Sequence, residues 1–382
     1  MSASVLVDAS NLMVGGGVQV GASFVDVLAS LHEDPEVRQR WSWIGDVVVE
    51  ASDVVIANQT AIGAGLPVEV VDGRPAARLR RRLDRADRRA FDVSFTVFGP
   101  DYGPRRARKR VVGFADVTSL FPEFAGIRGR RARLRHAARR RVSRRLFRSA
   151  DLLVTESSFV SAALTERWGI PAHRVKVVPN VLNQVFRDEA RQLPVQVELP
   201  DVPLLAFPTR PYPHKNLAVL GAAEGVLREE HGRSVRFALT LTPEEWQGLD
   251  PATRAVSVNV GPLMVGQMPG LYAACAGVVF PSLNECFSVT PLEAMMAARP
   301  LLASDRAFVR EVAGEAAWYF EPTEPASLAR ALAEMLGDED QCARRVAVGK
   351  QIADGWPTAN DRATAYLDII EEALGSGAAT AR

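Results

Sequence analysis

Short runs of apolar residues, many of them β-branched, recur along the chain and alternate with stretches whose apolar residues follow helical spacing. In the first half these runs predict strands at residues 5–7, 47–49, 54–57, 68–71, 93–98, 111–114, near 151–157 and at 175–180. In the second half they predict strands at residues 204–207, 237–241, 256–260, 277–280, 301–303 and 318–320. Because strands that alternate with helices build parallel sheets covered on both faces, the pattern predicts an α/β fold.

A polar stretch at residues 189–203, rich in Pro and Gln, interrupts this alternation and is typical of a linker. The length of 382 residues also favours two domains. We therefore expect a first domain over residues 1–187 and a second over residues 188–355. Residues 356–382 are a separate C-terminal segment, in which Thr358 and Asp361 are expected to cap a final amphipathic helix.

The segment from residue 280 to residue 305 has the layout of a ligand site. A buried strand leads into a loop, and a helix follows with Thr290 expected as its N-cap. Ligands bind at such loops in open α/β sheets, and the free N–H groups of a helix N-terminus favour phosphate. Glu285 and Glu293 flank the loop and could accept hydrogen bonds from sugar hydroxyls, which together suits a sugar nucleotide. Alternatively, Glu293 completes a capping box with Thr290, and Glu285 is an ordinary loop carboxylate.

Two cations follow the strand predicted at residues 204–207. Arg210 and Lys215 lie in the loop before the next helix, where they could neutralise a diphosphate as leaving-group charge develops. Cations near a helix start are disfavoured by the helix dipole, so their placement suggests that an anion is expected there. The alternative is a pair of ordinary surface cations.

The stretch PSLNECFSVTPLEAM resembles the E-x7-E motif of GT-B fold glycosyltransferases, most closely those of family 4 (group 1). The resemblance covers roughly the whole chain and is strongest over residues 151–305. It implies two Rossmann-like parallel-sheet domains facing a cleft, with a C-terminal helix that crosses back to the first domain. This sequence departs from the commoner motif, because Cys286 and Ser288 stand where glycines often occur.

The resemblance also implies roles for the residues of the second domain. Glu285 would contact the donor sugar, Glu293 the nucleotide ribose, and Arg210 with Lys215 the diphosphate, so that the catalytic candidates are Glu285, Arg210 and Lys215. The backbone of the loop after residue 260 would contact the nucleobase. The donor-binding candidates are Glu293, Phe287, Ser288, Val289, Thr290, Gly261 and Leu263.

The acceptor is expected on the first domain. The glycine loop at residues 15–17 follows the first strand but lacks the spacing of a dinucleotide or P-loop motif. In GT-B enzymes such a loop faces the cleft, so Gly16 and Gly17 are candidates for close approach to a ligand; the alternative is a tight turn. Asp116 is the candidate acceptor-side carboxylate, or else a surface turn residue. Asn180 is expected beside the cleft, although Val181 replaces the glycine usual in the family.

Composition excludes several other classes of protein. Three cysteines are too few and too scattered for a disulfide framework or a metal cluster, which favours a reducing cytoplasm. No apolar run reaches the roughly 20 residues needed to span a bilayer, and the N-terminus reads directly into a strand without a signal pattern. We therefore expect a cytoplasmic protein without a metal or cofactor. The nucleoside-diphosphate sugar would be a substrate and not a cofactor.

The net charge of +1 conceals two strongly basic segments, at residues 78–89 and 128–148. The second contains eleven arginines and no acidic residue. Its apolar residues form a thin stripe at Leu134, Ala138, Val142 and Leu146. Such a helix predicts peripheral contact with the inner face of the membrane, with Arg131, Arg135 and Arg139 as contacts. Nucleic acid is the competing partner, but it normally requires aromatic stacking residues, and a solvated helix face is the third alternative.

The resemblance to family 4 implies a retaining glycosyltransferase of hexosyltransferase type. It would move a sugar from a nucleoside diphosphate to a glycan or lipid-linked acceptor, in the synthesis of a bacterial surface polysaccharide or glycoconjugate. No acid and base pair of the glycosidase kind is evident, so the donor diphosphate would take the proton of the acceptor, as is proposed for the family. The alternatives are a non-hydrolysing sugar-nucleotide epimerase, an inactive sugar-nucleotide binder, and an arginine-rich nucleic-acid-binding protein.

Overall fold

The computed structural model describes residues 3–59, 66–74, 77, 90–101 and 106–378. The chain divides into two compact units. Unit 1 comprises Met1–Leu120, Ile127–Asn180 and Pro357–Arg382, and unit 2 comprises Phe121–Gly126 and Val181–Trp356. The basic segment at residues 78–89 lies outside the described residues. Within the described ranges, no helix combines the length and apolar character that crossing a bilayer would require.

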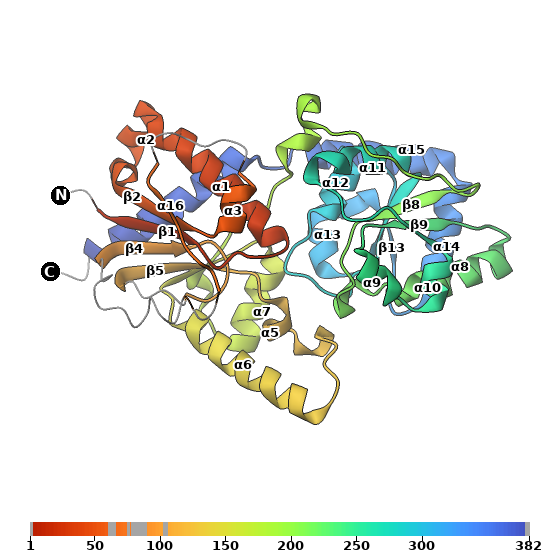
Figure 1. Cartoon of the computed structure of the whole chain (residues 1–382), viewed down its shortest axis with the longest axis horizontal. Helices are drawn as coiled ribbons and strands as arrows, with labels where there is room; N and C mark the ends of the chain where they lie inside the picture. Colours follow the sequence, from red (N-terminus) through yellow and green to blue (C-terminus); the bar gives the residue numbers. More distant parts are fainter. Residues whose placement is uncertain (1–2, 60–65, 75–76, 78–89, 102–105, 379–382) are drawn as a thin grey trace. The chain divides into compact units, whose positions relative to one another are not determined.

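Unit 1 is built on a parallel sheet of seven strands in the order β3-β2-β1-β4-β5-β6-β7 (Figure 1). The strands are β1 (Val5–Ala9), β2 (Val47–Ala51), β3 (Val68–Val70), β4 (Ala90–Thr96), β5 (Arg106–Phe114), β6 (Leu152–Thr155) and β7 (Val175–Val177). All five residues of β1 are buried. Because side chains of a strand point alternately to the two faces, both faces of the sheet are covered at β1. The strand order reverses between β1 and β4, as in a Rossmann-like sheet.

The helices of unit 1 follow the expected alternation with one exception. They are α1 (Gly16–Glu33), α2 (Pro35–Arg40), α3 (Asp53–Ala57), α5 (Val117–Leu120), α6 (Arg130–Arg148), α7 (Ser158–Trp168) and α16 (Ala359–Ala378). The strand expected at residues 54–57 is wrong, because this apolar run forms α3. The Ser52 hydroxyl caps that helix by accepting a hydrogen bond from the Val55 amide at 3.1 Å.

Unit 2 contains a parallel sheet of six strands in the order β10-β9-β8-β11-β12-β13. These are β8 (Leu204–Phe207), β9 (Arg236–Leu239), β10 (Ser257–Asn259), β11 (Gly277–Phe280), β12 (Leu301–Ser304) and β13 (Ala317–Phe320). The helices are α8 (Ala218–His231), α9 (Pro243–Gln247), α10 (Pro251–Ala255), α11 (Met268–Ala274), α12 (Thr290–Met296), α13 (Ala307–Ala313), α14 (Pro325–Gly337) and α15 (Glu339–Asp354). Every residue of β8, β11 and β12 is buried, so these central strands lie between two helical layers (Figure 1).

The terminal helix α16 belongs to unit 1, where it packs against α1, β4 and β5. Its Tyr366 ring contacts the rings of Phe24 and Phe95, with centroids 5.1 and 4.9 Å away. Thr358 and Asp361 exchange the hydrogen bonds of the expected cap, since the Thr358 amide donates to the Asp361 carboxylate at 2.8 Å and the Asp361 amide donates to the Thr358 hydroxyl at 3.2 Å. The α/β architecture of two Rossmann-like domains with a returning helix is therefore confirmed.

The division between the units lies elsewhere than the expected boundaries at residues 187 and 355. The chain enters unit 2 after Asn180 and leaves it after Trp356. Arg187, which was expected to end the first domain, donates a hydrogen bond to the Ala353 carbonyl of unit 2 at 2.9 Å. Unit 2 also includes Phe121–Gly126, a short segment whose Gly126 lies directly against Pro213.

Candidate active site

The loops that follow β8 and β11 meet at one point of the sheet in unit 2. These strands are neighbours, and the strand order reverses between them, which is where α/β sheets bind ligands. The Leu283 amide of the second loop donates to the His214 carbonyl of the first at 2.7 Å. The backbone of the two loops is thus joined directly. The ring of His214 stacks on that of Tyr212, with centroids 5.7 Å apart. Burial lowers the pKa of His214, so this side chain adds no charge here at neutral pH.

Lys215 and Glu285 form an ion pair across these loops. The Lys215 Nζ donates to Glu285 Oε1 at 2.7 Å, and the two side chains are only 15% and 11% exposed. The ammonium also lies 5.7 Å from the centre of the Phe280 ring. Because a pair this enclosed is poorly screened by water, each charge holds the other in place. Lys215 has three N–H donors, so donors remain for a second anionic group.

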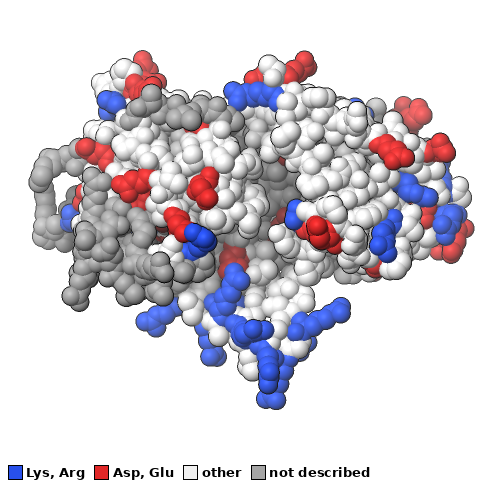
Figure 2. Space-filling model, viewed as in Figure 1, with Lys and Arg blue, Asp and Glu red and all other residues white. Residues whose placement is uncertain are grey.

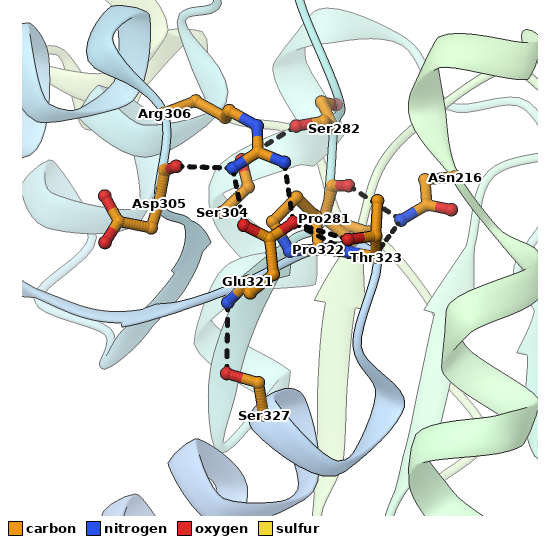
Figure 3. A network of polar contacts seen from close by, with 10 residues as sticks. All are labelled: Asn216, Pro281, Ser282, Ser304, Asp305, Arg306, Glu321, Pro322, Thr323 and Ser327. Carbon is orange, nitrogen blue, oxygen red and sulfur yellow. Dashed lines mark hydrogen bonds and ion pairs between the residues drawn. The ribbon is translucent and has the colours of Figure 1, made fainter.

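Asn216 fixes the turn that carries Lys215. Its backbone is left-handed, with φ at +57°, which Asn tolerates better than most residues. Its Nδ2 donates to the carbonyls of Pro281 at 3.3 Å and Pro322 at 2.7 Å, as Figure 3 shows. Asn216 therefore joins the Lys215 turn to the starts of the loops after β11 and β13.

A second group of contacts braces the same edge of the sheet. Arg306 binds both carboxylate oxygens of Glu321, at 2.9 and 2.7 Å (Figure 3). The hydrogen bonds from Arg306 lower the pKa of Glu321 to about 2. Beside them, the buried Ser304 hydroxyl donates to the Ser282 carbonyl at 2.7 Å. These contacts hold the loops after β11, β12 and β13 together on a rigid base.

Arg210 does not share the carboxylate of Lys215. It pairs with Glu245 of α9 at 2.8 Å, and its side chain is 49% exposed. Glu245 also accepts a hydrogen bond from the Thr242 amide at 3.0 Å, as part of the capping box of α9. The two cations singled out from the sequence thus lie in the same loop but bind different carboxylates, one enclosed and one at the surface.

Glu293 lies in the first turn of α12, and its partner is Tyr272 of α11. The Tyr272 hydroxyl, which is fully buried, donates to Glu293 Oε2 at 2.7 Å. Burial raises the pKa of Glu293 to about 7, and the hydrogen bond from Tyr272 opposes that rise. The expectation that Thr290 caps α12 is wrong, because Val289 occupies the N-cap position and no side chain caps the helix. Glu293 consequently serves no capping box with Thr290.

The other donor-side candidates surround this helix start. Phe287, Ser288 and Val289 are partly exposed in the loop before α12, whereas Thr290 is buried. The Phe287 ring lies 6.3 Å from that of Trp356. In the same loop, Ser282 Oγ and Asn284 Nδ2 are buried and have no hydrogen-bond partner among the described residues. The loop therefore keeps unused hydrogen-bonding groups, which is uncommon for buried polar atoms.

Gly261 and Leu263 follow β10, at the far edge of the same sheet. Gly261 has a φ of +75°, a conformation that favours glycine, and its amide donates to Asn259 Oδ1 at 3.3 Å. Leu263 is partly exposed. Two strands, β9 and β8, separate these residues from the loop of Glu285, so only an extended ligand would contact both.

The acceptor-side candidates all lie in unit 1. Gly16 and Gly17 are the first two residues of α1, and a Cβ added to Gly16 would meet no atom within 4 Å. Asp116 uses both carboxylate oxygens within the unit, accepting from Thr118 and Ser119 on one and from Ser143 on the other, each at 3.1 Å. Asp116 thus caps α5 and anchors α6, a role that differs from the surface turn residue named as the alternative.

Asn180 contacts the terminal helix. Its Oδ1 accepts a hydrogen bond from Arg362 of α16 at 2.8 Å. Arg362 is buried and also donates to the Ser23 hydroxyl at 3.0 Å. Burial raises the pKa of the neighbouring Glu156 to about 7, and the positive charge of Arg362 opposes that rise. Asn180 is therefore part of the polar contact that secures α16 to unit 1.

A metal centre would require several ligating side chains close together. In the part of the chain that the structure describes, no group of three or more His, Cys, Asp or Glu side chains is placed to hold an ion.

Three residues of this site were missed from the sequence: Tyr272, Asn216 and Glu245. Tyr272 was detectable in principle, because a tyrosine in a buried helix needs an acceptor for its hydroxyl. Nothing in the sequence identifies Glu293 as that acceptor, since the two are 21 positions apart. Glu245 has the signal of a capping box in Thr242-x-x-Glu245, but this does not identify Arg210 as its partner. Asn216 has no sequence signal beyond its residue type.

Comparison with known proteins places these loops in a wider context. Residues 203–338 match the family described as glycosyl transferases group 1, and residues 25–184 match glycosyltransferase family 4. The O-antigen chain mannosyltransferase B of Escherichia coli is 26% identical over 308 residues, which cover 74% of this chain and 78% of that protein.

Solved structures are similar over nearly the whole chain. Sucrose-phosphate synthase from Thermosynechococcus elongatus superposes with a TM-score of 0.70 at 14% identity, over 98% of this chain and 100% of that one. Anabaena Alr3699/HepE, solved in complex with UDP-glucose, superposes with a TM-score of 0.65 at 16% identity, with the same coverage of both chains. At these identities the likeness establishes a shared fold.

Proposed function

The chain belongs to the group 1 glycosyltransferases of family 4, and we propose that it transfers a sugar from a nucleoside diphosphate to a glycan acceptor with retention of configuration. The observation that carries the proposal is the enclosed pair of Lys215 and Glu285 at the carboxyl ends of β8 and β11. A cation and a carboxylate held rigidly side by side suit a ligand in which a phosphate adjoins a sugar.

In the proposed complex the donor lies across unit 2, from the loop after β11 to the loop after β10. Glu285, fixed by Lys215, accepts hydrogen bonds from the sugar hydroxyls. Glu293 accepts from the ribose, and the backbone near Gly261 and Leu263 contacts the base. The amides at the start of α12 bind the phosphates, which the positive end of the helix favours.

Lys215 and Arg210 would share the charge of the diphosphate in different ways. Lys215 keeps its enclosed bond to Glu285 and uses its remaining N–H donors on a phosphate oxygen. Arg210 is half exposed, and a surface ion pair such as that with Glu245 contributes only about 0–1 kcal/mol. Arg210 can therefore leave Glu245 for the diphosphate at little cost when the donor binds.

The proposed reaction breaks the bond between the anomeric carbon and the phosphate oxygen. The acceptor hydroxyl forms its new bond on the same face of the sugar, and its proton passes to an oxygen of the departing diphosphate. Lys215 and Arg210 stabilise the charge that develops on this leaving group. No side-chain base and no cofactor is required in this scheme.

The sugar and pathway are proposed from the curated relative. It is named as an O-antigen chain mannosyltransferase, so we propose mannose as the first sugar to test and a cell-surface polysaccharide as the product. The acceptor would contact unit 1 near Gly16 and Gly17, at the start of α1, where a Cβ added to Gly16 would meet no atom within 4 Å.

The test is a thermal-shift screen of nucleoside-diphosphate sugars, including mannose linked to guanosine diphosphate and to uridine diphosphate, followed by a transfer assay on each hit. Lys215→Ala and Glu285→Ala should each lower transfer by at least a hundredfold, about 3 kcal/mol or more in the barrier. Lys350→Ala is the control, because Lys350 forms an exposed pair with Asp354 on α15. Transfer by both site variants at the rate of the control would refute the assignment, as would release of an isomerised donor without any acceptor.

A further inference from the structure

Helix α6 carries a concentration of positive charge that the rest of the protein does not balance locally. Ten of its 19 residues are arginine and none is acidic, although the whole chain has a net charge of only +1. Lys and Arg side chains gather on the surface over this helix (Figure 2). Like charges this close repel one another, so the helix requires strong anchoring or a partner of opposite charge.

One face of α6 supplies the anchoring. His136 contacts the Thr118 carbonyl at 3.2 Å, the Arg140 Nε donates to the Ser119 carbonyl at 2.9 Å, and the Ser143 hydroxyl donates to Asp116. Phe147 is fully buried, with its ring centre 4.7 Å from that of Phe114. These contacts recur every three or four residues, so they fix which face of the helix points away from unit 1.

The face that points away is amphipathic. Leu134 and Val142, members of the apolar stripe seen in the sequence, are 63% and 57% exposed and therefore take no part in the core of unit 1. The arginines around them are also exposed: Arg131, Arg135, Arg139, Arg141 and Arg145. None of these five forms an ion pair with a carboxylate among the residues that the structure describes. We call Leu134, Val142 and these five arginines the outer face of α6.

We propose that the outer face of α6 docks on a membrane surface rich in anionic lipid. The arginines match the charge of the headgroups, and Leu134 and Val142 can enter the boundary between headgroups and acyl chains. This docking requires neither donor nor acceptor, so it is independent of the proposed transfer reaction. It would place unit 1, the expected acceptor side, against the layer in which a lipid-linked acceptor resides.

The same face fits nucleic acid less well. Single-stranded nucleic acid is bound by stacking on aromatic side chains, yet Phe147, the one aromatic residue of α6, is fully buried. Exposed Leu and Val between the arginines gain nothing from a phosphate backbone, whereas a lipid surface offers them an apolar environment. The apolar residues are therefore the feature that distinguishes the two partners.

The first experiment measures binding of the full chain to vesicles by co-sedimentation, without nucleotide sugar. We expect binding to mixed phosphatidylcholine and phosphatidylglycerol vesicles, and weak binding to phosphatidylcholine alone. Arg131→Gln combined with Arg135→Gln should weaken binding roughly thirtyfold, since each basic residue near an anionic surface contributes about 1 kcal/mol. The matched control is Arg330→Gln combined with Arg344→Gln, two exposed arginines of unit 2 whose loss should change vesicle binding little.

The second experiment separates lipid from nucleic acid. Leu134→Gln should weaken vesicle binding about tenfold, because a buried Leu side chain contributes about 1.5–3 kcal/mol when fully removed from water and somewhat less at an interface. The same variant should bind duplex DNA no differently from the wild type. Equal vesicle binding by the wild type and the double arginine variant would overturn the proposal, as would DNA binding tighter than vesicle binding. Circular dichroism of each variant checks that the helix persists.

Discussion

Replacing Tyr272 by phenylalanine removes one hydroxyl group and tests whether Glu293 acts as a carboxylate on the donor. In the structure this hydroxyl donates to Glu293 at 2.7 Å, and it is the interaction that restrains the burial-driven rise in the pKa of Glu293 to about 7. If the ribose requires the ionised carboxylate, donor affinity in the wild type should be constant at high pH. It should fall as the pH drops through about 7 and be roughly tenfold weaker one unit below.

The magnitude follows from the lost hydrogen bond. A hydrogen bond to a charged group contributes about 1.5–3 kcal/mol, which corresponds to a pKa rise of about 1–2 units. The midpoint of donor affinity in Tyr272→Phe should therefore move up to about pH 8–9. At pH 7, where the wild-type carboxyl is half ionised, the variant should bind roughly 5–50-fold more weakly than the wild type, and at high pH the difference should almost vanish.

Calorimetric titration with a nucleotide sugar over this pH range measures the shift. Tyr319→Phe is the matched control, since Tyr319 is another largely buried tyrosine of unit 2 whose hydroxyl donates to the Gly314 carbonyl at 2.6 Å. Its pH profile should coincide with that of the wild type. An unshifted midpoint in Tyr272→Phe, or weakening by the same factor at every pH, would refute the reasoning, because either result assigns Tyr272 a packing role alone.

Three further predictions concern other contacts. In a double-mutant cycle of Lys215→Met and Glu285→Gln, the unfolding free energies should show a coupling of about 1–3 kcal/mol, because each single change leaves the charge of a largely buried partner unpaired. Additive effects in urea unfolding would contradict the enclosed pair. Asn216→Gly keeps the left-handed backbone but removes the side-chain amide that binds the Pro281 and Pro322 carbonyls, so kcat/KM for transfer should be about tenfold lower. Unchanged kinetics would contradict this role. Burial raises the pKa of Glu156 to about 7, so its contribution to stability is present below its unfolded pKa and is lost as the pH rises to about 7. Glu156→Gln mimics the protonated form and should lack that part of the pH dependence, about 3 kcal/mol, in urea unfolding followed by tryptophan fluorescence; parallel wild-type and variant profiles would contradict the assignment.

The fold was largely predictable because most of its strands are buried on both faces. The apolar run at β11 predicts a strand at residues 277–280, and the strand has those bounds. The run at residues 54–57 looks alike but forms α3, because four apolar residues suit a strand or a helical turn equally well. Ser52 and Asp53, a capping residue and an acidic first residue, are the signals that favour the helix.

The pairing of Lys215 with Glu285 was partly predictable. Both residues were expected after strands of one sheet, and carboxyl ends of parallel strands lie at the same edge. Their 2.7 Å contact depends in addition on β8 and β11 being neighbours, which the order of strands along the chain does not give. Arg210 shows the limit of the same logic, because α9 presents Glu245 to it instead.

Partners far apart in the chain account for what the sequence could not predict. The Tyr272 contact with Glu293 exists because α11 and α12 lie together in the folded unit, and neither residue is unusual for its helix. The Thr290-x-x-Glu293 pattern has the letters of a capping box, yet α12 begins one residue earlier and Glu293 binds Tyr272. The exposure of the apolar stripe of α6 likewise depends on which face of this helix packs against the rest of unit 1.

In the proposed complex the donor is held by the loops after β8 and β11. Hydrogen–deuterium exchange with and without a nucleotide sugar at saturation tests this most directly. We predict protection of amides at residues 208–216 and 281–290, and loss of that protection in Glu285→Ala at the same donor concentration. Saturable donor binding that leaves both loops as exposed to exchange as before, with protection confined to other segments, would contradict it.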